Sequence, residues 1–585
     1  GAGAVRQDLP SADRVWSLWL MDISKTAIEK IKNVLIVVLV LSTILLLYFL
    51  WSDSTVGDFS LAGLGSSRAE PIPAKSVLNP DKITVSFGAE NYTVIAPTAA
   101  DWDGSAPSAG MGAGIIQELQ AFSLSGMILT SVISKNDFVD VMRARSIMAD
   151  FPFTMPFAEF CSEYGLRGLT RTDLIESFTG VAYSEASPNS VFFFNKREER
   201  YYRLAADGSD ADFESLISGI EGRGNASFYP LRMYSGIENE VMIPLDMQIS
   251  MEPIPYWGAV DGMGEDEGDE GAGMAKKLFG NSFDFTRKIT EGNGTTVYMY
   301  GYGERVLVLN QDGSFEYSAS GRDSNGVPSF FEALDIALDF ISQHGALEAC
   351  GMTADRLYLR KVETDPDGGR GYRFSFGFST GGYAVHYLND EALVVGTMGD
   401  QATYFKQNLI DCQDIISYPE DWAEQEALRP FDLLTENFMP IFDVLDGLQI
   451  ALEPEGSEAG ADAGADMAKE MAFEAVVRGV SDVSAGYLRR EPSFAWEAEG
   501  YGAPDGGVGA GAGGQQGTGA GVGAGTGGQP GAGSQQGTGA GGQQADAWMY
   551  GDQLPDMLLP VWVFTVMGVD FYFDMYGGDL VGHTA

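Results

Sequence analysis

The longest apolar run in the chain covers Val34–Trp51 and is interrupted only by one serine and one threonine. At 1.5 Å of rise per residue, a helix of about 18 residues crosses most of a hydrocarbon core of roughly 30 Å. Because Lys25, Lys30 and Lys32 precede this predicted transmembrane helix, residues 1–33 are expected to be a cytoplasmic leader and the remainder extracytoplasmic. A cleaved signal peptide is the alternative, but its apolar region usually has only about 7 to 15 residues and a small-x-small cleavage site.

Beyond this run, apolar and polar positions follow patterns typical of a mixed α and β chain. A polar, turn-rich stalk over residues 52–80 leads into a first predicted domain over residues 81–256. That domain opens with a hairpin that turns at Gly88–Asn91, and helical spacing predicts one helix over Ile115–Ser134 and another from Phe138. Further along, the pattern predicts an extended Phe151–Phe157, a hairpin over Val191–Leu204 and a helix over Asp212–Ile220.

Residues 257–277 are rich in glycine and acidic residues, and we interpret them as an acidic linker that ends the first domain. Clustered carboxylates also suggest a calcium loop. Such a loop needs ligands at fixed offsets, a turn glycine and a distal glutamate, and this stretch lacks that order. A linker is therefore the preferred interpretation.

A second domain of the α+β type is predicted over residues 278–411. Alternating strands close around the turn Asn310–Gly313. Ser329 is followed three residues later by Glu332, a capping box that predicts the start of a helix. The apolar residues of that helix share one face, namely Phe330, Leu334, Ala337, Leu338 and Ile341. At least three antiparallel strands are expected to follow it.

A third α+β domain is predicted over residues 412–585 and begins with a helix around Leu433–Leu445. The segment FEAVVRGVSDVSAGYLRR indicates a return to strand alternation. Residues 453–470 and 501–545 are dominated by small residues that cannot build a core, so we interpret them as disordered inserts. The chain closes with a hairpin that turns at Met567–Gly568, which predicts that the longer insert lies between paired strands.

The expected fold class is therefore α+β: a single N-terminal transmembrane helix followed by an extracytoplasmic part made of antiparallel sheets, each covered by helices. The charge composition of the chain restricts the classes of molecule that it can bind. The chain has 82 acidic against 36 basic residues and a formal net charge of -46. Such a surface repels phosphate backbones, which argues against nucleic acid as a partner.

No constellation of catalytic residues stands out in the sequence, so we expect a protein that is not an enzyme. The G-x-G-x-x-G matches between Gly507 and Gly542 lie in low-complexity sequence, without the strand and helix that a nucleotide site needs. With three histidines and three cysteines far apart, the chain offers almost no zinc ligands, and no cofactor is expected. His344 is expected to end a helix and His386 to lie on a strand, both in structural roles.

Three segments together resemble a known family. They are the N-terminal IKNVLIVVLVLSTILLLYFLW, the middle VYMYGYGERVLVLNQDGSFEYSAS with the helix that follows it, and the closing LLPVWVFTVMGVDFYFDMYGGDLVG. Their order is similar to that of the YycH family, the single-pass accessory regulators of the WalK sensor histidine kinase in Gram-positive bacteria. The closing hairpin is also similar to YycI and to PepSY-like modules, whereas the acidic and glycine-rich inserts depart from the family pattern.

The resemblance implies a membrane-anchored extracytoplasmic regulator of a sensor histidine kinase, in two-component signalling for cell-wall homeostasis. It would contact a WalK-like kinase through its membrane helix and a YycI-like protein through its external domains. Leu35, Leu39, Ser42 and Leu46 share one helix face with a small polar residue, and we predict that this face binds the partner. The alternative is an envelope protein that binds an external peptide, glycan or lipid, or that inhibits a protease as a PepSY-like module.

Overall fold

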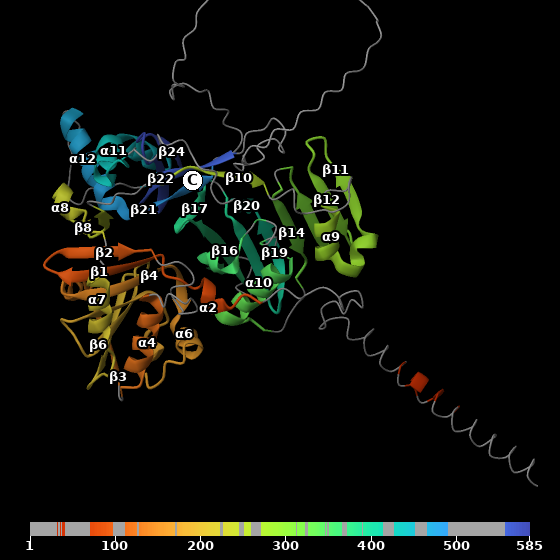
Figure 1. Ribbon diagram of the computed structural model, residues 1–585, viewed down its shortest axis with the longest axis horizontal. Coiled ribbons are helices and arrows are strands. Elements are labelled where there is room, and N and C mark those ends of the chain that lie inside the picture. Colours follow the sequence, from red (N-terminus) through yellow and green to blue (C-terminus); the bar gives the residue numbers. More distant parts are fainter. Residues whose placement is uncertain are drawn as a thin grey trace, which may run out of the picture. The chain divides into compact units, whose positions relative to one another are not determined.

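The computed structural model describes most of the chain beyond the N-terminal segment (Figure 1). The structure describes residues 71–96, 111–125, 128–169, 172–222, 226–244, 251–258, 271–311, 313–321, 326–344, 352–364, 371–388, 390–412, 426–450, 465–489 and 556–584. It also describes the single residues or short ranges 32, 35, 36, 38–40, 42, 347 and 350. They fall into two compact units, one that includes Ala275–Phe285 and one that comprises Glu70–Met274 and Thr286–Ala585. The predicted α+β class is confirmed for this part of the chain.

The first sheet has nine strands in the order β3-β7-β6-β5-β4-β1-β2-β8-β9, and each neighbouring pair is antiparallel. Its strands are β1 (Lys82–Gly88), β2 (Asn91–Ile95), β3 (Ile128–Ile133), β4 (Ser146–Pro156), β5 (Ser177–Ser184), β6 (Ser190–Asn195), β7 (Arg200–Ala206), β8 (Phe228–Pro230) and β9 (Met242–Pro244). The helices of this region are α2 (Ala74–Val77), α4 (Met111–Ser123), α5 (Lys135–Met142), α6 (Phe157–Glu163), α7 (Phe213–Glu221) and α8 (Arg232–Ser235).

Helices cover both faces of the first sheet. Tyr183 of β5 stacks on Phe213 of α7 with ring centroids 4.5 Å apart. The preceding residue, Ala182, belongs to a cluster with Phe138 of α5 on the other side, because successive strand residues point to opposite faces. The predicted turn at Gly88–Asn91, which joins β1 to β2, is confirmed.

The second sheet has fifteen strands, and its main path runs β11-β12-β13-β14-β19-β18-β16-β17-β21-β22-β10-β20, with β15, β23 and β24 off this path. Its earlier strands are β10 (Ile254–Gly258), β11 (Arg287–Thr290), β12 (Thr296–Tyr300), β13 (Arg305–Leu309), β14 (Phe315–Ala319), β15 (Leu357–Thr364) and β16 (Gly371–Thr380). The later ones are β17 (Tyr383–Tyr387), β18 (Leu393–Met398), β19 (Gln401–Gln407), β20 (Ile410–Asp411), β21 (Val480–Arg489), β22 (Asp556–Val566), β23 (Val569–Asp574) and β24 (Leu580–His583). Within this sheet β17 and β21 pair in parallel, and the other described strand pairs are antiparallel.

The helices of this later part are α9 (Ala272–Phe279), α10 (Phe330–His344), α11 (Pro430–Gly447) and α12 (Ala465–Gly479). The predicted capping box of α10 is confirmed, since the Glu332 carboxylate accepts from the Ser329 backbone N–H and the Ser329 hydroxyl accepts from the Glu332 N–H. The predicted apolar face of α10 is buried. It packs on the second sheet, where the Phe330 ring lies 5.9 Å from that of Phe374 on β16.

Pairing within the second sheet crosses the predicted domain ranges. β10 lies at the end of the first predicted domain, yet it pairs with β22 near the C-terminus and with β20. β21 and β22 are antiparallel partners on either side of residues 490–555, so the predicted insertion between paired strands is confirmed. The domain ranges themselves remain a prediction.

Several predicted elements differ from the structure. The end of the disordered insert predicted over residues 453–470 is helical, because α12 begins at Ala465. The helix predicted over Ile115–Ser134 ends at Ser123 as α4, and the next segment is strand β3, because Ile128, Val132 and Ile133 are β-branched residues that favour a strand. The first part of FEAVVRGVSDVSAGYLRR continues helix α12, and the strand β21 begins only at Val480. In such short segments, the pattern of apolar residues alone does not show where a helix ends and where the next strand begins.

Candidate functional site

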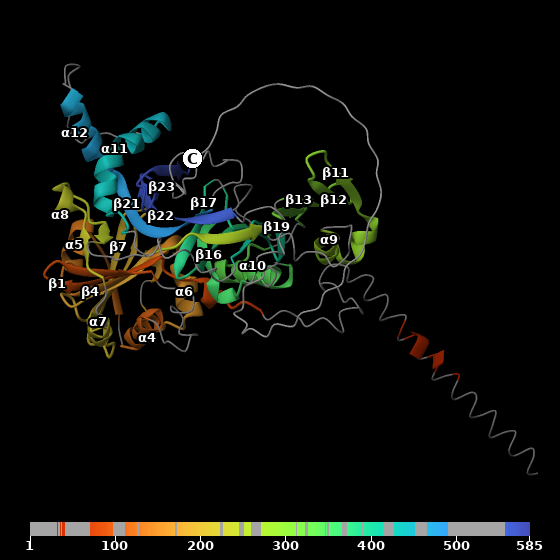
Figure 2. The ribbon, with the colours of Figure 1, turned by 45° about the horizontal axis from the view of Figure 1, so that its top comes forward.

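A polar junction joins the first sheet to the C-terminal part of the chain. We define it as β1, the segment Glu238–Glu240, and the connection from α12 to β21. Both ribbon views place α8 beside α11 and β21 (Figures 1 and 2), and the rings of Tyr234 on α8 and Phe431 on α11 are 5.3 Å apart. Segments more than two hundred residues apart in sequence therefore meet here.

Asn239 is the central residue of the junction. Its buried side-chain amide donates to the backbone carbonyls of Val477 and Val480, both at 2.8 Å. Its carbonyl oxygen accepts from the Val241 N–H at 2.8 Å. The last carbonyls of a helix have no partner within the helix, so Asn239 satisfies one such group at the end of α12 from a distant part of the chain.

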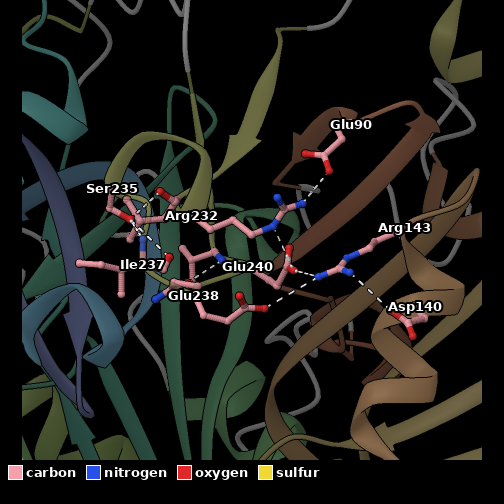
Figure 3. Close-up of polar contacts among 11 residues, drawn as sticks. Glu90, Asp140, Arg143, Arg232, Ser235, Ile237, Glu238 and Glu240 are labelled. Carbon is pink, nitrogen blue, oxygen red and sulfur yellow. Dashed lines mark hydrogen bonds and ion pairs between the residues drawn. The ribbon is translucent and has the colours of Figure 1, made fainter. Parts of the chain in front are cut away.

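The residues on either side of Asn239 form an ion-pair network with the first sheet (Figure 3). The Glu240 carboxylate lies 2.7 Å from Arg143 at the end of α5 and 3.2 Å from Arg232 of α8. Arg232 also contacts Glu90 in the β1–β2 turn at 2.9 Å, and Arg143 lies 3.9 Å from Glu238. These side chains are partly exposed, so each pair adds little stability and the network acts mainly through its geometry.

Local sequence explains how these side chains come to point in opposite directions. α8 ends at Gly236, whose φ of 70° is a left-handed conformation that glycine adopts without strain. The Ser235 hydroxyl donates to Leu231 O and accepts from the Ile237 N–H, which fixes the turn. After this turn the Asn239 amide faces the end of α12, and the carboxylates of its two neighbours face Arg143.

A second contact of the junction lies on β1. The ammonium group of Lys82 donates to the carboxylate of Asp482 on β21, and both side chains are partly buried. Burial works against the charged form, but the carboxylates of Asp482, Asp81 and Asp150 raise the pKa of Lys82 above its ordinary value. Lys82 therefore stays charged at neutral pH. The buried Asp150 is in turn paired with Lys196 at 2.5 Å.

The predicted partner-binding face lies in the N-terminal segment. Leu35, Leu39 and Ser42 are helical and exposed, whereas Leu46 lies outside the described residues. The Ser42 hydroxyl donates to Leu39 O at 2.8 Å. Within the part of the chain that the structure describes, none of the helices has the length and hydropathy of a membrane span.

The three cysteines are free thiols, and burial raises the pKa of each to about 12. A thiol with that pKa stays protonated at neutral pH and is a poor nucleophile or metal ligand. Over the described ranges, no group of three or more His, Cys, Asp or Glu side chains is placed to hold a metal ion.

His386 lies on β17, as predicted, in a packing role. Both of its ring nitrogens are buried without a hydrogen-bond partner among the described residues. Burial, and then the nearby Arg360, lower its pKa to about 3, so the ring is neutral. The ring lies against Gly486 of β21, where an added Cβ would come within 2.7 Å of it. His344 ends α10, as predicted, with its ring 4.5 Å from that of Phe340.

The residues of the junction were not identified from the sequence. Asn239 lies in an unremarkable Glu-Asn-Glu stretch, and its partners are backbone carbonyls that no sequence pattern marks. The alternation of acid and amide was the available signal, but acidic residues are too numerous in this chain for any pair to stand out. What the junction can do chemically is hold two parts of the fold in one orientation through hydrogen bonds and ion pairs.

Comparison with known proteins gives one similar structure. No protein-family profile matches the chain, and no curated protein matches its sequence. The crystal structure of YycH from Bacillus subtilis is similar with a TM-score of 0.43 and 9% sequence identity, over 72% of this chain and 94% of that one. The match agrees with the resemblance to YycH that the sequence segments indicate.

Proposed function

We propose that this chain is a membrane-anchored extracytoplasmic regulator of a sensor histidine kinase and that it acts by protein contact. In this proposal the membrane helix contacts a WalK-like kinase and the external part contacts a YycI-like protein. The protein performs no catalysis of its own. The choice of kinase follows from the three sequence segments that resemble the YycH family.

The observation that carries the proposal is the polar junction. A regulator that acts by contact must present its surfaces in a fixed relation, because a contact made in one part has to affect another. Asn239 bonds to the α12–β21 connection, while Glu240 pairs with Arg143 at the end of α5 and with Arg232 of α8. Directional contacts of this kind fix an orientation, which general apolar burial does not.

The N-terminal helix supplies the proposed contact with the kinase. Leu35, Leu39 and Ser42 recur at intervals of three and four residues and therefore share a face. The Ser42 hydroxyl donates within its own helix, so its oxygen remains able to accept a hydrogen bond from a partner helix. Small polar residues of this kind let membrane helices approach closely.

Co-purification from native membranes tests the proposal. The full chain should retain a sensor kinase, and exchange of residues 34–51 for an unrelated membrane span should abolish the association. Within the same span, Ser42→Leu should weaken the association, whereas Ser42→Ala should weaken it less because the small size is kept. Retention of the kinase after the exchange would contradict the proposal. Recovery of an envelope peptidase in place of a kinase would favour the protease-inhibiting alternative.

A further inference from the structure

The turn that joins β12 to β13 presents a tyrosine in a strained backbone conformation. Tyr302 has a φ of 57°, a left-handed value that a bulky residue adopts only at a cost in free energy. The neighbouring Gly301 and Gly303 also have positive φ, at 58° and 101°. Turns with positive φ at successive positions usually have glycine, asparagine or aspartate there. The turn itself therefore does not explain a tyrosine at position 302.

Tyr302 is also fully exposed to solvent. The nearby Tyr300 differs, because the Arg305 guanidinium covers its ring at 5.1 Å from the ring centroid. Full exposure leaves the Tyr302 ring without packing against the described part of the chain, so packing does not offset the cost of the backbone. An exposed aromatic ring keeps its apolar surface in water, which is a second cost.

Other side chains that are held at positive φ have a contact inside the protein. Glu199, with a φ of 50°, pairs with Lys135 at 2.8 Å. Met567, with a φ of 52°, lies against Gly479, where an added Cβ would come within 2.9 Å of the methionine side chain. Tyr302 has the same backbone strain and points into solvent. Strain of this kind is typical of residues that bind a ligand or a partner.

The hairpin holds Tyr302 in a fixed position. The Gly303 N–H donates to Tyr300 O at 3.1 Å, and the Ser320 N–H at the end of β14 donates to Glu304 O at 2.7 Å. A tyrosine side chain has only two torsions, and here its backbone is already ordered. A partner that binds the ring would therefore lose little affinity to the ordering of this turn.

The exposed charge closest in sequence to Tyr302 is a carboxylate. Glu304 is exposed, and its carboxylate lies over the turn, where a Cβ added to Gly301 would come within 2.5 Å of it. The chain as a whole has a formal net charge of -46. Electrostatic complementarity therefore favours a partner whose surface is basic around the point of contact.

We propose that Tyr302 is an anchor residue for a partner protein, which accepts the ring in an apolar pocket with a basic rim. The ring leaves water when it fills the pocket, and this burial offsets the strain only in the complex. Glu304 pairs with a lysine or arginine at the rim. The inference rests on the proposed function, because it assigns a contact residue to a protein that acts by contact, but it does not depend on the membrane helix.

Site-specific photocrosslinking of the full chain in native membranes tests the inference. Residue 302 is replaced by p-benzoylphenylalanine in one variant and residue 567 in the matched control, because both positions have a left-handed backbone in a hairpin turn. Irradiation should give one protein adduct at residue 302 and none at residue 567. Mass spectrometry of the adduct should map apolar side chains of the partner with lysine or arginine beside them.

Binding of the purified partner from that adduct, measured by biolayer interferometry, then tests single residues. Tyr302→Ala should weaken binding about thirtyfold, and Tyr302→Phe only about threefold because the ring supplies most of the buried area. Glu304→Lys should weaken it about fivefold, and Met567→Ala should leave it unchanged. Tyr302→Asn should weaken binding as much as Tyr302→Ala, yet raise the urea midpoint of the chain by about 0.1 to 0.3 M, because asparagine tolerates a left-handed backbone.

Several outcomes would overturn the inference. They are no adduct at residue 302, equal adducts at residues 302 and 567, an adduct with lipid or with a second copy of this chain, and a mapped pocket with an acidic rim. Unchanged binding by Tyr302→Ala, or a lower urea midpoint for Tyr302→Asn, would overturn it as well. Kinase retention without the adduct rejects only this inference, and the adduct without kinase retention rejects only the proposed kinase contact.

Discussion

The aromatic core of the first sheet and the polar junction stabilise the fold in different ways. In the core, Phe157, Phe160, Phe178 and Phe193 are fully buried and pack in edge-to-face pairs. In the junction, Asn239 makes directional bonds between parts that are distant in sequence. Apolar burial scales with area and tolerates small rearrangements, whereas a buried amide is satisfied only in one arrangement. The core should therefore determine stability and the junction should determine orientation.

Truncation in the core should have the largest effect. Phe178 lies with its ring 4.9 Å from Phe160 and 5.1 Å from Phe193, so Phe178→Ala leaves a cavity among aromatic rings. We expect a loss of about 3 to 5 kcal/mol in the free energy of unfolding, measured by urea denaturation. Leu124→Ala, at an exposed position, is the control and should be nearly neutral. If both variants lost a similarly small amount of unfolding free energy, the aromatic core would not be the main source of stability.

Asn239→Asp should break the junction while it leaves the core intact. Aspartate can still accept from the Val241 N–H, but it loses both donors and places a carboxylate beside the carbonyls of Val477 and Val480. The expected cost is about 2 to 4 kcal/mol. Hydrogen exchange should become faster at the end of α12 and the start of β21 and stay unchanged around Phe178.

The neighbouring Glu238→Gln variant is the matched control, because that side chain is exposed and makes only a 3.9 Å ion pair. It should show wild-type exchange. If Asn239→Asp instead accelerates exchange throughout the first sheet, orientation and stability are not separate properties of this fold.

His386 adds a polar group to the apolar interior of the second sheet, and its effect should appear as a dependence on pH. Its pKa is lowered to about 3 in the folded protein from a model-peptide value of 6.5. Between these values the unfolded chain binds a proton that the folded chain does not bind. Stability is therefore complete above about pH 6.5 and falls by up to about 1.4 kcal/mol per pH unit as the pH is lowered towards 3.

His386→Phe should make this loss shallower, because the ring-sized side chain has no proton to bind. Denaturation curves between pH 7 and pH 4 measure the difference in slope, and a change in packing alone would shift both ends of the curve equally. Parallel pH profiles for the two proteins would show that the ring does not titrate on unfolding.

The smallest effects on stability are expected from ion pairs. A partly buried pair should contribute more than an exposed pair. A double-mutant cycle on Lys82 and Asp482, whose side chains are 23% and 31% exposed, should give a coupling of about 1 to 2 kcal/mol. The same cycle on Lys135 and Glu199, with 59% and 66% exposure, should give no measurable coupling. Equal couplings would mean that the junction has no energetic advantage over an ordinary surface pair.

Sequence patterns predicted the elements that local rules determine. The capping box at Ser329 and Glu332 and the apolar face of α10 depend on spacing within one helix, so both could be identified. The β1–β2 and β22–β23 hairpins follow from glycine at turns with positive φ, such as Gly88 and Gly568. These signals act over a few residues, and the rest of the fold does not override them.

Contacts between distant segments could not be predicted in the same way. The pairing of β10 with β22 depends on the path of the chain between them, and neither strand has a sequence pattern that identifies the other as its partner. Asn239 binds backbone carbonyls, which every residue has. The strand β3 was predicted as the end of a helix, because its apolar residues also fit helical spacing and tertiary pairing with β7 decided between the two.

The pairing of β21 with β22 has a consequence for how the chain can vary in length. Arg489 and Leu558 are direct partners, so the ends of the long connection between these strands are held together by the sheet itself. The entropic cost of closing a loop grows only with the logarithm of its length, by about 0.6 kcal/mol for each doubling. Repeats of small residues can therefore be gained or lost at this position with little effect on folding, and the site would accept an inserted sequence as a fusion point.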